Sequence, residues 1–590
     1  MHDTRDPGWV TSVPLTLSNG VVSQWTVRRI AVIGPGIVGM PMAALLAEAR
    51  VRIGQDEPAH VVVVQRNSPT SGWKVAAINE GRSPIGGLEP RLDQLVREAV
   101  ADGRMSASHD PAALADADVI LVCVQTDKTG LAPDYGPLME ALEGLTEALT
   151  ARPADNVPLI VFESTLAPSS MSTVIRDFFS ARGLEEGRDV LLGNSPNRVM
   201  PGRLVERVAQ SDKIVAGLSP ATPQLIARLY GHIVTAGRLH ETNSLTAELV
   251  KTLENAYRDV RIAYSAEVAR YCDAEDVDFF ALRDQINQAL AQTDAATSDP
   301  QAVPSGGLLV PTIGVGGHCL PKDGILLWWR AIEAGFDTAN SLILGSRAIN
   351  DASPAATLAL AETAHGSLAG CRVALLGVAY RFDSEDTRNS PTLSLVPLLQ
   401  QRGASVIMHD PYVSSTDQNL ERSGTTDLFT RDLDQAMAAA DVVVFCVGHT
   451  AYGDGLEGIL ADRDRLRTVV DACNLTSRRV VEAAGLTYTG IGRGTRAPTD
   501  ELLEHVLTGF RAMERGVANE LAALIEFLNQ HYSQDHFGAV SWDQVQRLAG
   551  TCVTGCVLVA PGPIQAPEQP TAFTSELVSR ALASPASAVA

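Results

Sequence analysis

The sequence predicts an α/β protein with two doubly wound parallel sheets that are separated by a helical segment. Short apolar runs alternate with helix-like segments in two series, one that begins at Arg29 and one that begins at about Gly370. Apolar runs of this kind are typical of parallel strands whose two faces are both covered by helices. Between the series, from about 218 to 350, no comparable run appears, and a long helical pattern takes its place.

The first series predicts an α/β domain over residues 27–217. Its opening strand, IAVIG, is followed by a glycine turn and then by the helical segment VGMPMAALLAEA. Further predicted strands are VVVV at 61–64, VILVCV at 119–124, LIVFES at 159–164 and DKIVAG at 212–217. Residues 1–26 have weak patterning and are predicted to form an N-terminal extension.

Three further regions follow this domain along the chain. Residues 218–350 are predicted to form a helical central domain around a long helix from about Ser244 to Cys272, which Asn243 or Ser244 caps. Residues 368–495 are predicted to form the second, smaller α/β domain, with strands VALLGVAY, SVIMHDP, DVVVFCVG and TVVDAC. Residues 496–590 are predicted to be a helical extension that ends in a flexible tail, because the last 30 residues are rich in Pro, Ala and Ser.

Length, charge and cysteine content narrow the class of protein. At 590 residues the chain is too long for one core, and three or four domains are expected. Its 69 acidic against 47 basic side chains give a net charge of −22, which argues against a nucleic-acid partner or attachment to an anionic membrane. The eight scattered cysteines favour reduced thiols and a cytoplasmic location, and no metal site, membrane span or secretory signal is expected.

One cysteine stands in a segment that suits chemistry. Cys319 lies in GVGGHCLPKD, residues 314–323, behind a glycine-rich turn and just before Lys322 and Asp323. A thiolate is the nucleophile of cysteine chemistry, and a cationic neighbour or a helix N-terminus stabilises it. Glycines let the backbone approach a substrate closely. By itself, the segment also suits a small buried cysteine beside a turn, which is the usual place of a free cysteine.

A second segment indicates a dinucleotide site. Gly34, Gly36 and Gly39 form GPGIVG directly after a strand and directly before a helix, which is the context that the dinucleotide fingerprint requires. The alternative is a glycine turn that only packs a helix on a sheet. The acidic residue expected at the end of the second strand is missing, and Gln65 and Arg66 stand there instead. A glutamine can bind a ribose hydroxyl, and an arginine can bind a 2′-phosphate. These residues therefore favour NAD only modestly over NADP as the cofactor.

Polar residues also follow two strands of the first domain. Thr126 ends one strand, and Glu163 and Thr165 end another. The carboxyl ends of strands line the crevice of an open α/β sheet, and a carboxylate there is able to activate water. Arg198 follows in the turn NSPNRVMPGR. Each of these residues taken alone is also consistent with an ordinary polar strand terminus or turn.

Two clusters of cationic side chains complete the candidate site. Lys251, Asn255 and Arg258 share one face of the long predicted helix, where an amine is able to stabilise developing negative charge. Arg381 and Arg388 lie in GVAYRFDSEDTRNSPT, a strand-to-helix loop that suits phosphate recognition. A solvated helix face and a surface loop are the ordinary alternatives. The segments HDPY at 409–412 and GHTAY at 448–452 lie nearby in the same domain.

Together and in this order, the segments resemble the UDP-sugar 6-dehydrogenase family, over the chain from about Arg29 to Gly494. The resemblance rests on GPGIVG, INEGRSPIGGLEP, FEST, SPNRVMPG, VKTLENAYRD, GVGGHCLPKD, EDTRNSP and HDPY, and NAYRDVRIAY and GHTAY resemble the members that act on UDP-N-acetylhexosamines. It implies two Rossmann-like domains joined by a helical domain whose long helix mediates dimerisation. It also implies a homodimer or higher oligomer that uses NAD, NADP not being excluded, to oxidise the C6 alcohol of a UDP-sugar to a carboxylate.

The resemblance also implies roles for single residues. Cys319 matches the nucleophile that forms a thiohemiacetal and then a thioester, and Glu163 matches the acid/base residue of thioester hydrolysis. Lys251 and Asn255 match the residues that hold the C6 oxygen, while Asp323, assisted by Thr126, orders water. The implied cofactor residues are Gly34, Gly36, Ile37, Val38, Gly39, Gln65, Arg66, Thr126, Thr165 and Arg388, and the implied substrate residues are Arg198, Lys251, Asn255, Arg258, Gly316 and Arg381.

The sequence departs from the family pattern in four places. The ribose-binding acid is absent, and the segment RNSPTSGWK after the second strand is longer than usual. Gln125 replaces a usual proline, and Asn197 replaces a usual glutamate. Alternative functions are a UDP-glucose 6-dehydrogenase, a single-step hydroxyacid dehydrogenase, which has no use for Cys319, and a non-catalytic sugar-nucleotide sensor with residues 496–590 as its interaction module.

Overall fold

The structure, a computed structural model, describes residues 11–87, 89–152, 156–199, 201–294, 307–461, 463–552, 556–565 and 573–583. The first ten residues of the predicted extension and the last seven of the predicted tail lie outside these ranges. The chain forms two compact units. Unit 1 comprises Met1–Glu254, Ile325–Gly335 and Leu524–Val553, and unit 2 comprises Asn255–Gly324, Phe336–Ala523 and Thr554–Ala590.

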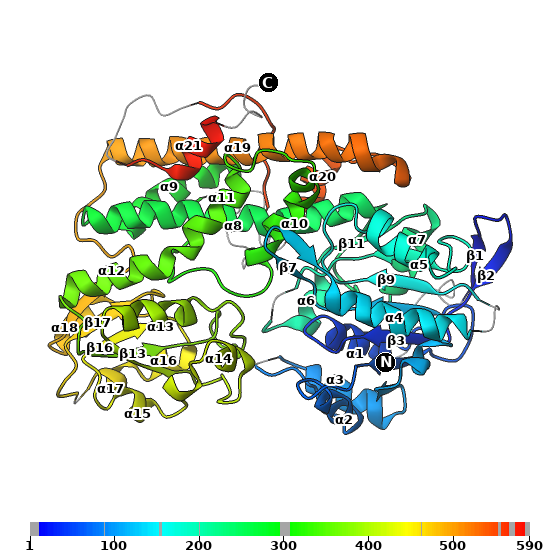
Figure 1. Ribbon diagram of the computed structural model, residues 1–590, viewed down its shortest axis with the longest axis horizontal. Helices are drawn as coiled ribbons and strands as arrows, with labels where there is room; N and C mark the ends of the chain where they lie inside the picture. The colour runs from blue at the N-terminus through cyan, green and yellow to red at the C-terminus, as the bar shows by residue number, and fades with distance from the viewer. Residues whose placement is uncertain are drawn as a thin grey trace. The chain divides into compact units, whose positions relative to one another are not determined.

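Unit 1 contains an eight-stranded sheet with the order β12-β11-β10-β9-β6-β3-β4-β5 (Figure 1). All neighbouring strands pair in parallel except β10 and β11, which are antiparallel. The five strands predicted for this domain are confirmed. The strands are β3 (Arg29–Ile33), β4 (His60–Val64), β5 (Met105–Ser108), β6 (Val119–Val122), β9 (Leu159–Phe162), β10 (Leu191–Asn194), β11 (Lys213–Gly217) and β12 (Leu239–Asn243).

Helices cover both faces of this sheet, which explains its continuous apolar runs. In β3, Ile30 and Val32 face one core while Ala31 and Ile33 face the other. The first core includes α1 (Gly39–Ala49), α3 (Leu92–Ala101), α6 (Leu204–Gln210) and α7 (Ala221–Tyr230), and the second includes α4 (Gly136–Thr150) and α5 (Arg176–Ser180). Smaller elements of this unit are α2 (Trp73–Asn79), β7 (Asp127–Thr129) and β8 (Ala132–Asp134).

The sheet of the first domain continues beyond residue 217, where that domain was predicted to end. The chain continues through α7 into β12, which pairs in parallel with β11 over its whole length, so the sheet extends to Asn243. The sequence of β12, LHETN, is polar, and only its last two residues are buried. A search for apolar runs therefore misses this strand, which lies at the edge of the sheet among the strands that the structure describes.

The N-terminal extension has a defined structure where it is described. Residues Val13–Thr16 (β1) and Val22–Trp25 (β2) form an antiparallel hairpin. Leu15 and Trp25 are buried in the first core of the sheet. Because two large side chains of the hairpin join that core, this part of the extension belongs to the folded unit.

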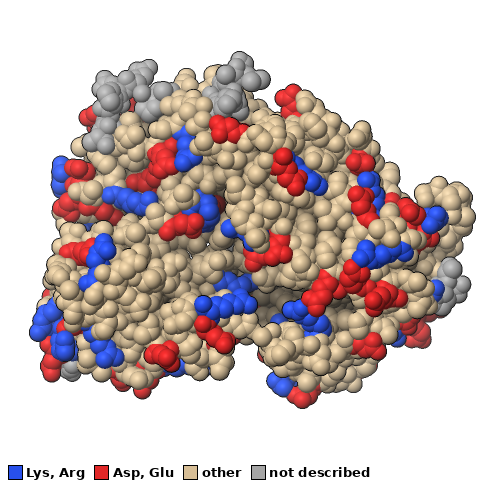
Figure 2. All heavy atoms as spheres, in the orientation of Figure 1, with Lys and Arg blue, Asp and Glu red and all other residues tan. Residues whose placement is uncertain are grey.

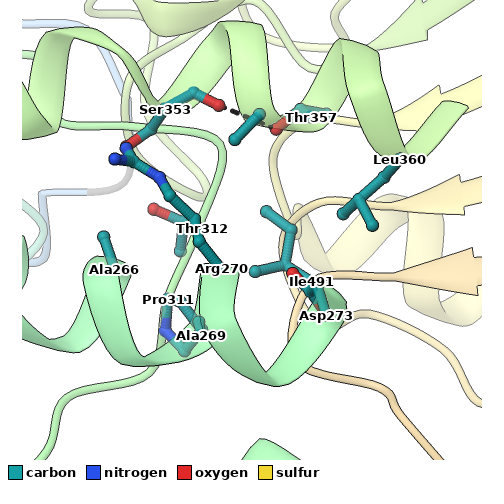
Figure 3. A pocket seen from close by; sticks show the side chains of 11 residues that line it. Ala266, Ala269, Arg270, Asp273, Pro311, Thr312, Ser353, Thr357, Leu360 and Ile491 are labelled. Carbon is teal, nitrogen blue, oxygen red and sulfur yellow. Dashed lines mark hydrogen bonds between the residues drawn. The ribbon is translucent and has the colours of Figure 1, made fainter. Parts of the chain in front are cut away.

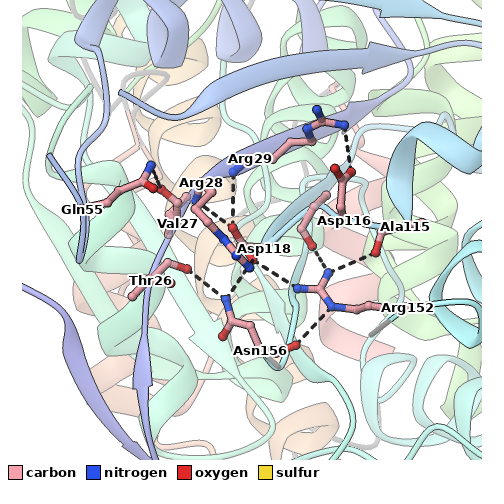
Figure 4. A network of polar contacts seen from close by, with 11 residues as sticks. Thr26, Val27, Arg28, Arg29, Gln55, Ala115, Asp116, Asp118, Arg152 and Asn156 are labelled. Carbon is pink, nitrogen blue, oxygen red and sulfur yellow. Dashed lines mark hydrogen bonds and ion pairs between the residues drawn. The ribbon is translucent and has the colours of Figure 1, made fainter. Parts of the chain in front are cut away.

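A buried carboxylate joins the beginnings of two central strands (Figure 4). Asp118, just before β6, is fully buried and accepts a hydrogen bond from the backbone N–H of Arg28, just before β3, at 2.7 Å. It also accepts from Asn156 at 2.8 Å and from the guanidinium of Arg152 at 3.1 Å. A buried charge is tolerated only when it is paired and hydrogen-bonded, as it is here.

Unit 2 contains a six-stranded, all-parallel sheet with the order β15-β14-β13-β16-β17-β18. Helices α12 and α13 pack on one face, and α15, α16 and α17 pack on the other. The four strands predicted for this domain are confirmed. The strands are β13 (Arg372–Leu376), β14 (Ser405–His409), β15 (Phe429–Thr430), β16 (Val442–Phe445), β17 (Thr468–Asp471) and β18 (Thr487–Gly490), and the helices are α12 (Ser353–His365), α13 (Pro391–Gln401), α14 (Gln418–Arg422), α15 (Leu433–Met437), α16 (Thr450–Asp454), α17 (Leu456–Leu460) and α18 (Arg478–Ala483).

The predicted long helix is confirmed as α8 (Ser244–Ala274), which begins in unit 1 and ends in unit 2. Asn243 caps it by accepting the backbone N–H of Thr246 at 2.8 Å. The other helices outside the two sheets are α9 (Phe279–Asp294), α10 (Leu320–Glu333), α11 (Leu342–Asp351), α19 (Asp500–Tyr532), α20 (Trp542–Ala549) and α21 (Glu576–Ala583).

The C-terminal extension covers α8 within unit 2. The hydroxyl of Tyr264 on α8 donates to the carbonyl of Val506 on α19 at 2.7 Å, and Figure 1 shows α19 in orange alongside α8 in green. Glu267 of α8 accepts a hydrogen bond from Ser575 at 2.7 Å, just before α21. The predicted flexible tail is therefore wrong for residues 573–583. Three buried side chains, Leu577, Val578 and Ala581, anchor α21 despite the Pro, Ala and Ser content around it.

The surface carries both signs of charge. On the face drawn in Figure 2, acidic and basic side chains are interspersed, and much of that face is uncharged. Among the described residues, no helix combines the length and the apolar character that crossing a membrane requires.

Candidate active site

The glycine turn of unit 1 has the geometry that a dinucleotide needs. Gly34 has φ of +93°, and a Cβ on it would lie 2.9 Å from the carbonyl oxygen of Cys123. A Cβ on Gly39 would lie 2.1 Å from the carbonyl oxygen of Gly34, so only glycine lets α1 approach the strand this closely. A Cβ on Gly36 would meet nothing within 4 Å. That open space and the N-terminus of α1, reached through half-buried Ile37 and Val38, fit a pyrophosphate.

Hydrogen bonds connect the loops that follow β6 and β9 in unit 1. Thr126 is buried, and its hydroxyl donates to the carbonyl of Thr165 at 2.7 Å. Ser164 donates to the carbonyl of Val124 at 2.6 Å. The structure thus brings together the two threonines that were predicted separately. Their loops lie at the carboxyl edge of the sheet, where open α/β sheets bind ligands.

Glu163 lies in a buried polar cluster that includes two residues the sequence analysis missed. Its carboxylate forms an ion pair with Lys213 at 2.7 Å, and the hydroxyl of Tyr230 donates to its other oxygen. Burial and the charge of Glu163 raise the pKa of Tyr230 well above its ordinary value, so that hydroxyl stays protonated. Lys213 opens β11 and Tyr230 ends α7, and neither position carries a motif, so only the fold brings these residues together.

In unit 2, the cysteine loop packs on the arginine loop. The backbone N–H of Gly317 donates to the carbonyl of Arg388 at 2.7 Å, and the side chain of Asn389 donates to the carbonyl of Gly317 at 2.9 Å. A Cβ on Gly316 would lie 2.6 Å from Tyr380, and one on Gly317 would lie 2.9 Å from the same ring. Both glycines are therefore required for this contact, which joins two motifs about 70 residues apart.

Cys319 precedes α10 and lies next to positive charge. Its carbonyl accepts the backbone N–H of Lys322 at 3.1 Å and that of Asp323 at 2.9 Å, so it stands at the helix N-terminus. The pKa of Arg388 is raised because Asp386, to which it donates through two nitrogens, outweighs the effect of burial, and Cys319 adds to the rise. Cys319 thus lies at the N-terminus of α10 and close to the Arg388 guanidinium.

Other cysteines of the chain are held as thiols. Burial raises the pKa of each of these groups above the ordinary range of a thiol, and for two of them to about 12. The residues are Cys123, Cys272, Cys371, Cys446 and Cys473. None of the five offers a ready nucleophile.

Asp323 is bound on both of its carboxylate oxygens within unit 2. The amide of Asn255 donates to one oxygen at 2.5 Å, and the Lys322 ammonium forms an ion pair with the other at 2.7 Å. Asp323 is fully buried, and Lys322 is only 2% exposed. The structure thus joins Asn255 and Asp323 as two members of one group. It adds Lys322, which the sequence analysis noted only as a neighbour of Cys319.

The other two helix residues stand where the spacing predicts. Lys251 is buried one turn before Asn255 on α8, and Arg258 is half-buried about one turn after it. Residues three or four apart on a helix are surface neighbours, so the three side chains share one side of α8. Lys251 belongs to unit 1, whereas Asn255 and Arg258 belong to unit 2.

Two motifs without a predicted role hold the loop that carries Arg381. Asp410 accepts the backbone N–H groups of Val378 at 2.7 Å and Ala379 at 2.9 Å, and the ring of His449 at 3.0 Å. The other ring nitrogen of His449 accepts the backbone N–H of Asp383 at 2.8 Å, so His449 donates through Nε2. Burial alone would raise the pKa of Asp410, but the hydrogen bonds from His449 and the backbone lower it.

Arg198, which was predicted to bind substrate, is held by several partners within unit 1. Its guanidinium is only 4% exposed and forms a bidentate ion pair with Glu254. It also donates to Thr551 at 2.8 Å and to the carbonyl of Leu548 at 3.0 Å. These last partners end α20 of the C-terminal extension. Family resemblance does not show these contacts, because they involve a segment that the extension adds; a substrate-binding role of Arg198 stays a prediction.

A small pocket lies elsewhere in unit 2 (Figure 3). Arg270 lines it and donates to Ser353 at 2.9 Å. Asp273 also lines it, accepts the backbone N–H of Gly492 at 2.7 Å, and has its pKa raised to about 7 by burial. None of the predicted site residues lines this pocket. Among the described residues, no group of three metal-ligating side chains lies close enough to hold a metal ion.

A glycine turn fit for a dinucleotide and a cysteine beside a buried carboxylate define an oxidoreductase of the dinucleotide-dependent class. Three models of the UDP-glucose/GDP-mannose dehydrogenase family match the chain. They are the NAD binding domain over residues 28–234, the central domain over 245–352 and the UDP binding domain over 374–478. The extension from α19 to α21 lies beyond the last of these matches.

Individual proteins agree with the family models. A UDP-N-acetyl-D-mannosamine dehydrogenase from Pyrococcus horikoshii is 31% identical over 471 residues, which cover 79% of this chain and 99% of the relative. An NDP-N-acetyl-D-galactosaminuronic acid dehydrogenase from Ralstonia nicotianae is 29% identical, and the match covers 77% of this chain and 98% of the relative. The solved UDP-D-ManNAc dehydrogenase from Pyrococcus horikoshii is 30% identical, with a TM-score of 0.65 over 79% of this chain and 99% of that one.

The chain belongs to the UDP-glucose/GDP-mannose dehydrogenase family. It is therefore an NAD-dependent nucleotide-sugar dehydrogenase, as the resemblance predicted. The family match also supports a UDP-sugar as the substrate class.

Proposed function

We propose that this chain oxidises the C6 hydroxyl of a UDP-N-acetylhexosamine, UDP-ManNAc or UDP-GlcNAc, to the carboxylate. The observation that carries the proposal is the position of Cys319. Cys319 stands at a helix N-terminus beside Arg388, and Arg388 lies on the arginine loop of the UDP binding domain. The names of similar proteins favour an N-acetylhexosamine over glucose, because UDP-N-acetyl-D-mannosamine dehydrogenases recur among them. A UDP-glucose 6-dehydrogenase is the alternative.

The proposed chemistry retains the aldehyde on the enzyme between two oxidations. When bound, NAD accepts one hydride in each oxidation. After the first, the Cys319 thiolate adds to the aldehyde carbon and forms a thiohemiacetal; after the second, the adduct is a thioester. Water then cleaves the C–S bond and releases the carboxylate and the thiol. One alcohol, one water and two NAD become one carboxylate, two NADH and three protons, so atoms and electrons balance.

The chain's own residues have separate tasks in this proposal. Lys251 and Asn255 would hold the C6 oxygen and stabilise negative charge on it, which is worth most where water is excluded. Asp323, fixed by Asn255 and Lys322, would order the water that attacks the thioester, assisted by Thr126. Glu163 would take part in hydrolysis through its ion pair with Lys213, because the Glu163 side chain is fully buried.

Substrate recognition would rest on unit 2 and on α8. Arg381 and Gly316 lie on the two loops that pack together, and Arg258 follows Asn255 on α8. Arg381 would meet the nucleotide phosphates, and Asp410 and His449 would position its loop. Arg388, on the same loop as Arg381, would contact the cofactor, as the resemblance implies.

The homo-oligomer and the cytoplasmic location stay predictions. The resemblance implies pairing through α8, but in unit 2 that helix is covered by α19 and α21 of the same chain. Light scattering on the purified full-length protein measures the oligomer directly.

Two measurements test the proposed reaction. The purified protein should yield two NADH for each UDP-sugar consumed, and a panel of UDP-ManNAc, UDP-GlcNAc, UDP-GalNAc and UDP-glucose should identify the preferred sugar. A ratio of one NADH would refute the four-electron mechanism. Cys319→Ser should stop uronate formation, whereas the control Cys371→Ser should not. Normal uronate formation by Cys319→Ser would exclude the thioester.

A further inference from the structure

The end of the cofactor pocket where an adenosine ribose binds carries an unusual charge in this chain. The ten residues after β4, Gln65 to Lys74, contain two cations and no acid. In NAD-binding domains, an acidic residue at this strand end hydrogen-bonds the ribose 2′-hydroxyl, and an arginine nearby accommodates a 2′-phosphate instead. The acid that binds a hydroxyl would repel a phosphate, so its absence removes the main obstacle to NADP.

Hydroxyl groups gather in the same segment. The Oγ atoms of Ser68 and Ser71 lie 2.7 Å apart, and the Gln65 amide donates to Ser71 at 2.9 Å. The backbone N–H of Ser71 donates to the Oγ of Ser68 at 3.1 Å, which folds residues 68–71 into a tight turn. Hydroxyls and an amide donate hydrogen bonds to phosphate oxygens as readily as to one another. The segment that contains Arg66 therefore also supplies neutral hydrogen-bond donors.

Arg66 is available to a phosphate because its present partner is weakly bound. It forms an ion pair with Glu140 of α4, and the two side chains are 58% and 61% exposed. Exposed pairs of this kind contribute about 0–1 kcal/mol, since water solvates both charges nearly as well. A doubly charged phosphate competes effectively for such an arginine, because its hydrogen bonds are charge-assisted and bidentate.

We propose that the ribose end of the dinucleotide pocket accepts a 2′-phosphate, so that this chain binds NADP as well as NAD, with Arg66 as the residue that decides between them. Ser68 and Ser71 supply neutral hydrogen-bond donors, and Gln65 takes the place of the acid that would exclude the phosphate. The proposal concerns the adenosine end of the cofactor only. It is independent of which sugar is oxidised and of the cysteine mechanism.

Calorimetric titration of the full-length protein with NAD and with NADP, without sugar, tests this directly. The ratio of the two dissociation constants, Kd for NADP over Kd for NAD, is expected to be below ten. Arg66→Ala is expected to raise that ratio at least tenfold. The control Arg188→Ala removes another exposed arginine of an ion pair in unit 1 and should leave the ratio unchanged. Gln65→Asp, which retains Arg66, should raise the ratio at least tenfold by repelling the phosphate.

A ratio of ten or more in the unsubstituted protein would overturn the proposal. So would a change of less than tenfold on Arg66→Ala, because the arginine would then play no part in the choice. If Arg66→Ala does not fold, the same threshold applies to Gln65→Asp. Because only binding is measured, failure here leaves the proposed sugar oxidation untouched, and a protein that oxidises no sugar still gives a result.

Discussion

The ion pair between Arg198 and Glu254 offers a sharp test of the structure, because family resemblance and geometry disagree about it. The perturbation is Arg198→Met, which keeps an unbranched stem about as long as the arginine stem and removes the guanidinium with its charge. The two side chains are only 4% and 2% exposed, so the change leaves Glu254 buried without a partner. Breaking a buried pair in this way costs about 3–5 kcal/mol.

The same substitution releases the end of α20. Arg198 donates to the carbonyl of Leu548 and to the hydroxyl of Thr551, and each hydrogen bond contributes about 1 kcal/mol, somewhat more with a charged donor. Loss of both hydrogen bonds should lower the free energy of local unfolding of α20 by about 2–3 kcal/mol. Since every 1.4 kcal/mol is tenfold, amide hydrogen exchange in Trp542–Ala549 should accelerate by roughly 30- to 140-fold.

Hydrogen exchange measured by mass spectrometry, together with the KM for the UDP-sugar, distinguishes the two roles. The matched control is Arg203→Met in the same segment, whose pair with Glu206 is 51% and 47% exposed and whose loss should change neither reading. If Arg198→Met leaves α20 exchange unchanged but raises the KM at least tenfold, Arg198 binds substrate as the resemblance implied, and the structural reasoning is refuted.

Three further perturbations test single features. Gly39→Ala places a Cβ 2.1 Å from the carbonyl oxygen of Gly34 and should lower the stability measured by thermal melting by about 1–3 kcal/mol. Gly36→Ala should melt like the unsubstituted protein and bind dinucleotide more weakly. Equal melting of the two variants would contradict this account. Asp118→Ala should lower stability by about 3 kcal/mol, because it removes the common acceptor of a buried network, and a loss below 1 kcal/mol would argue against that role. The raised pKa of Asp273, about 7, means that the folded protein retains a proton which the unfolded chain releases near pH 4, so stability falls as pH rises from 4 to 7. Asp273→Asn should therefore gain on the order of 1–3 kcal/mol over the unsubstituted protein at pH 8 and nothing at pH 4. A gain that does not change with pH would show that titration of Asp273 is not its cause.

Local signals in the sequence were enough to predict the two sheets and the long helix. The strands that were predicted carry short apolar runs, because both faces of each are buried. β12 was missed because it is a polar edge strand, and α21 was missed because three apolar side chains in a Pro-, Ala- and Ser-rich tail give too weak a periodic signal. Both misses involve elements that tertiary packing stabilises more than their own composition does.

For the site, the sequence by itself determined the kinds of group that are present. Glycines with the dinucleotide spacing, a cysteine before a helix and a helix with Lys251 and Asn255 on one face follow from residue order alone. Chemistry with local spacing is visible in a sequence, because neighbouring residues on a helix or turn are neighbours in space.

The tertiary structure alone decided which of these groups have partners. Lys213 and Tyr230 reach Glu163, and α20 takes up Arg198, through contacts between residues far apart in the chain. Such contacts depend on how strands and helices are ordered in space, and a buried charge is stable only where that order supplies its partner. No pattern along the chain records that order, which is why the sequence named the reactive groups but not the residues that hold them.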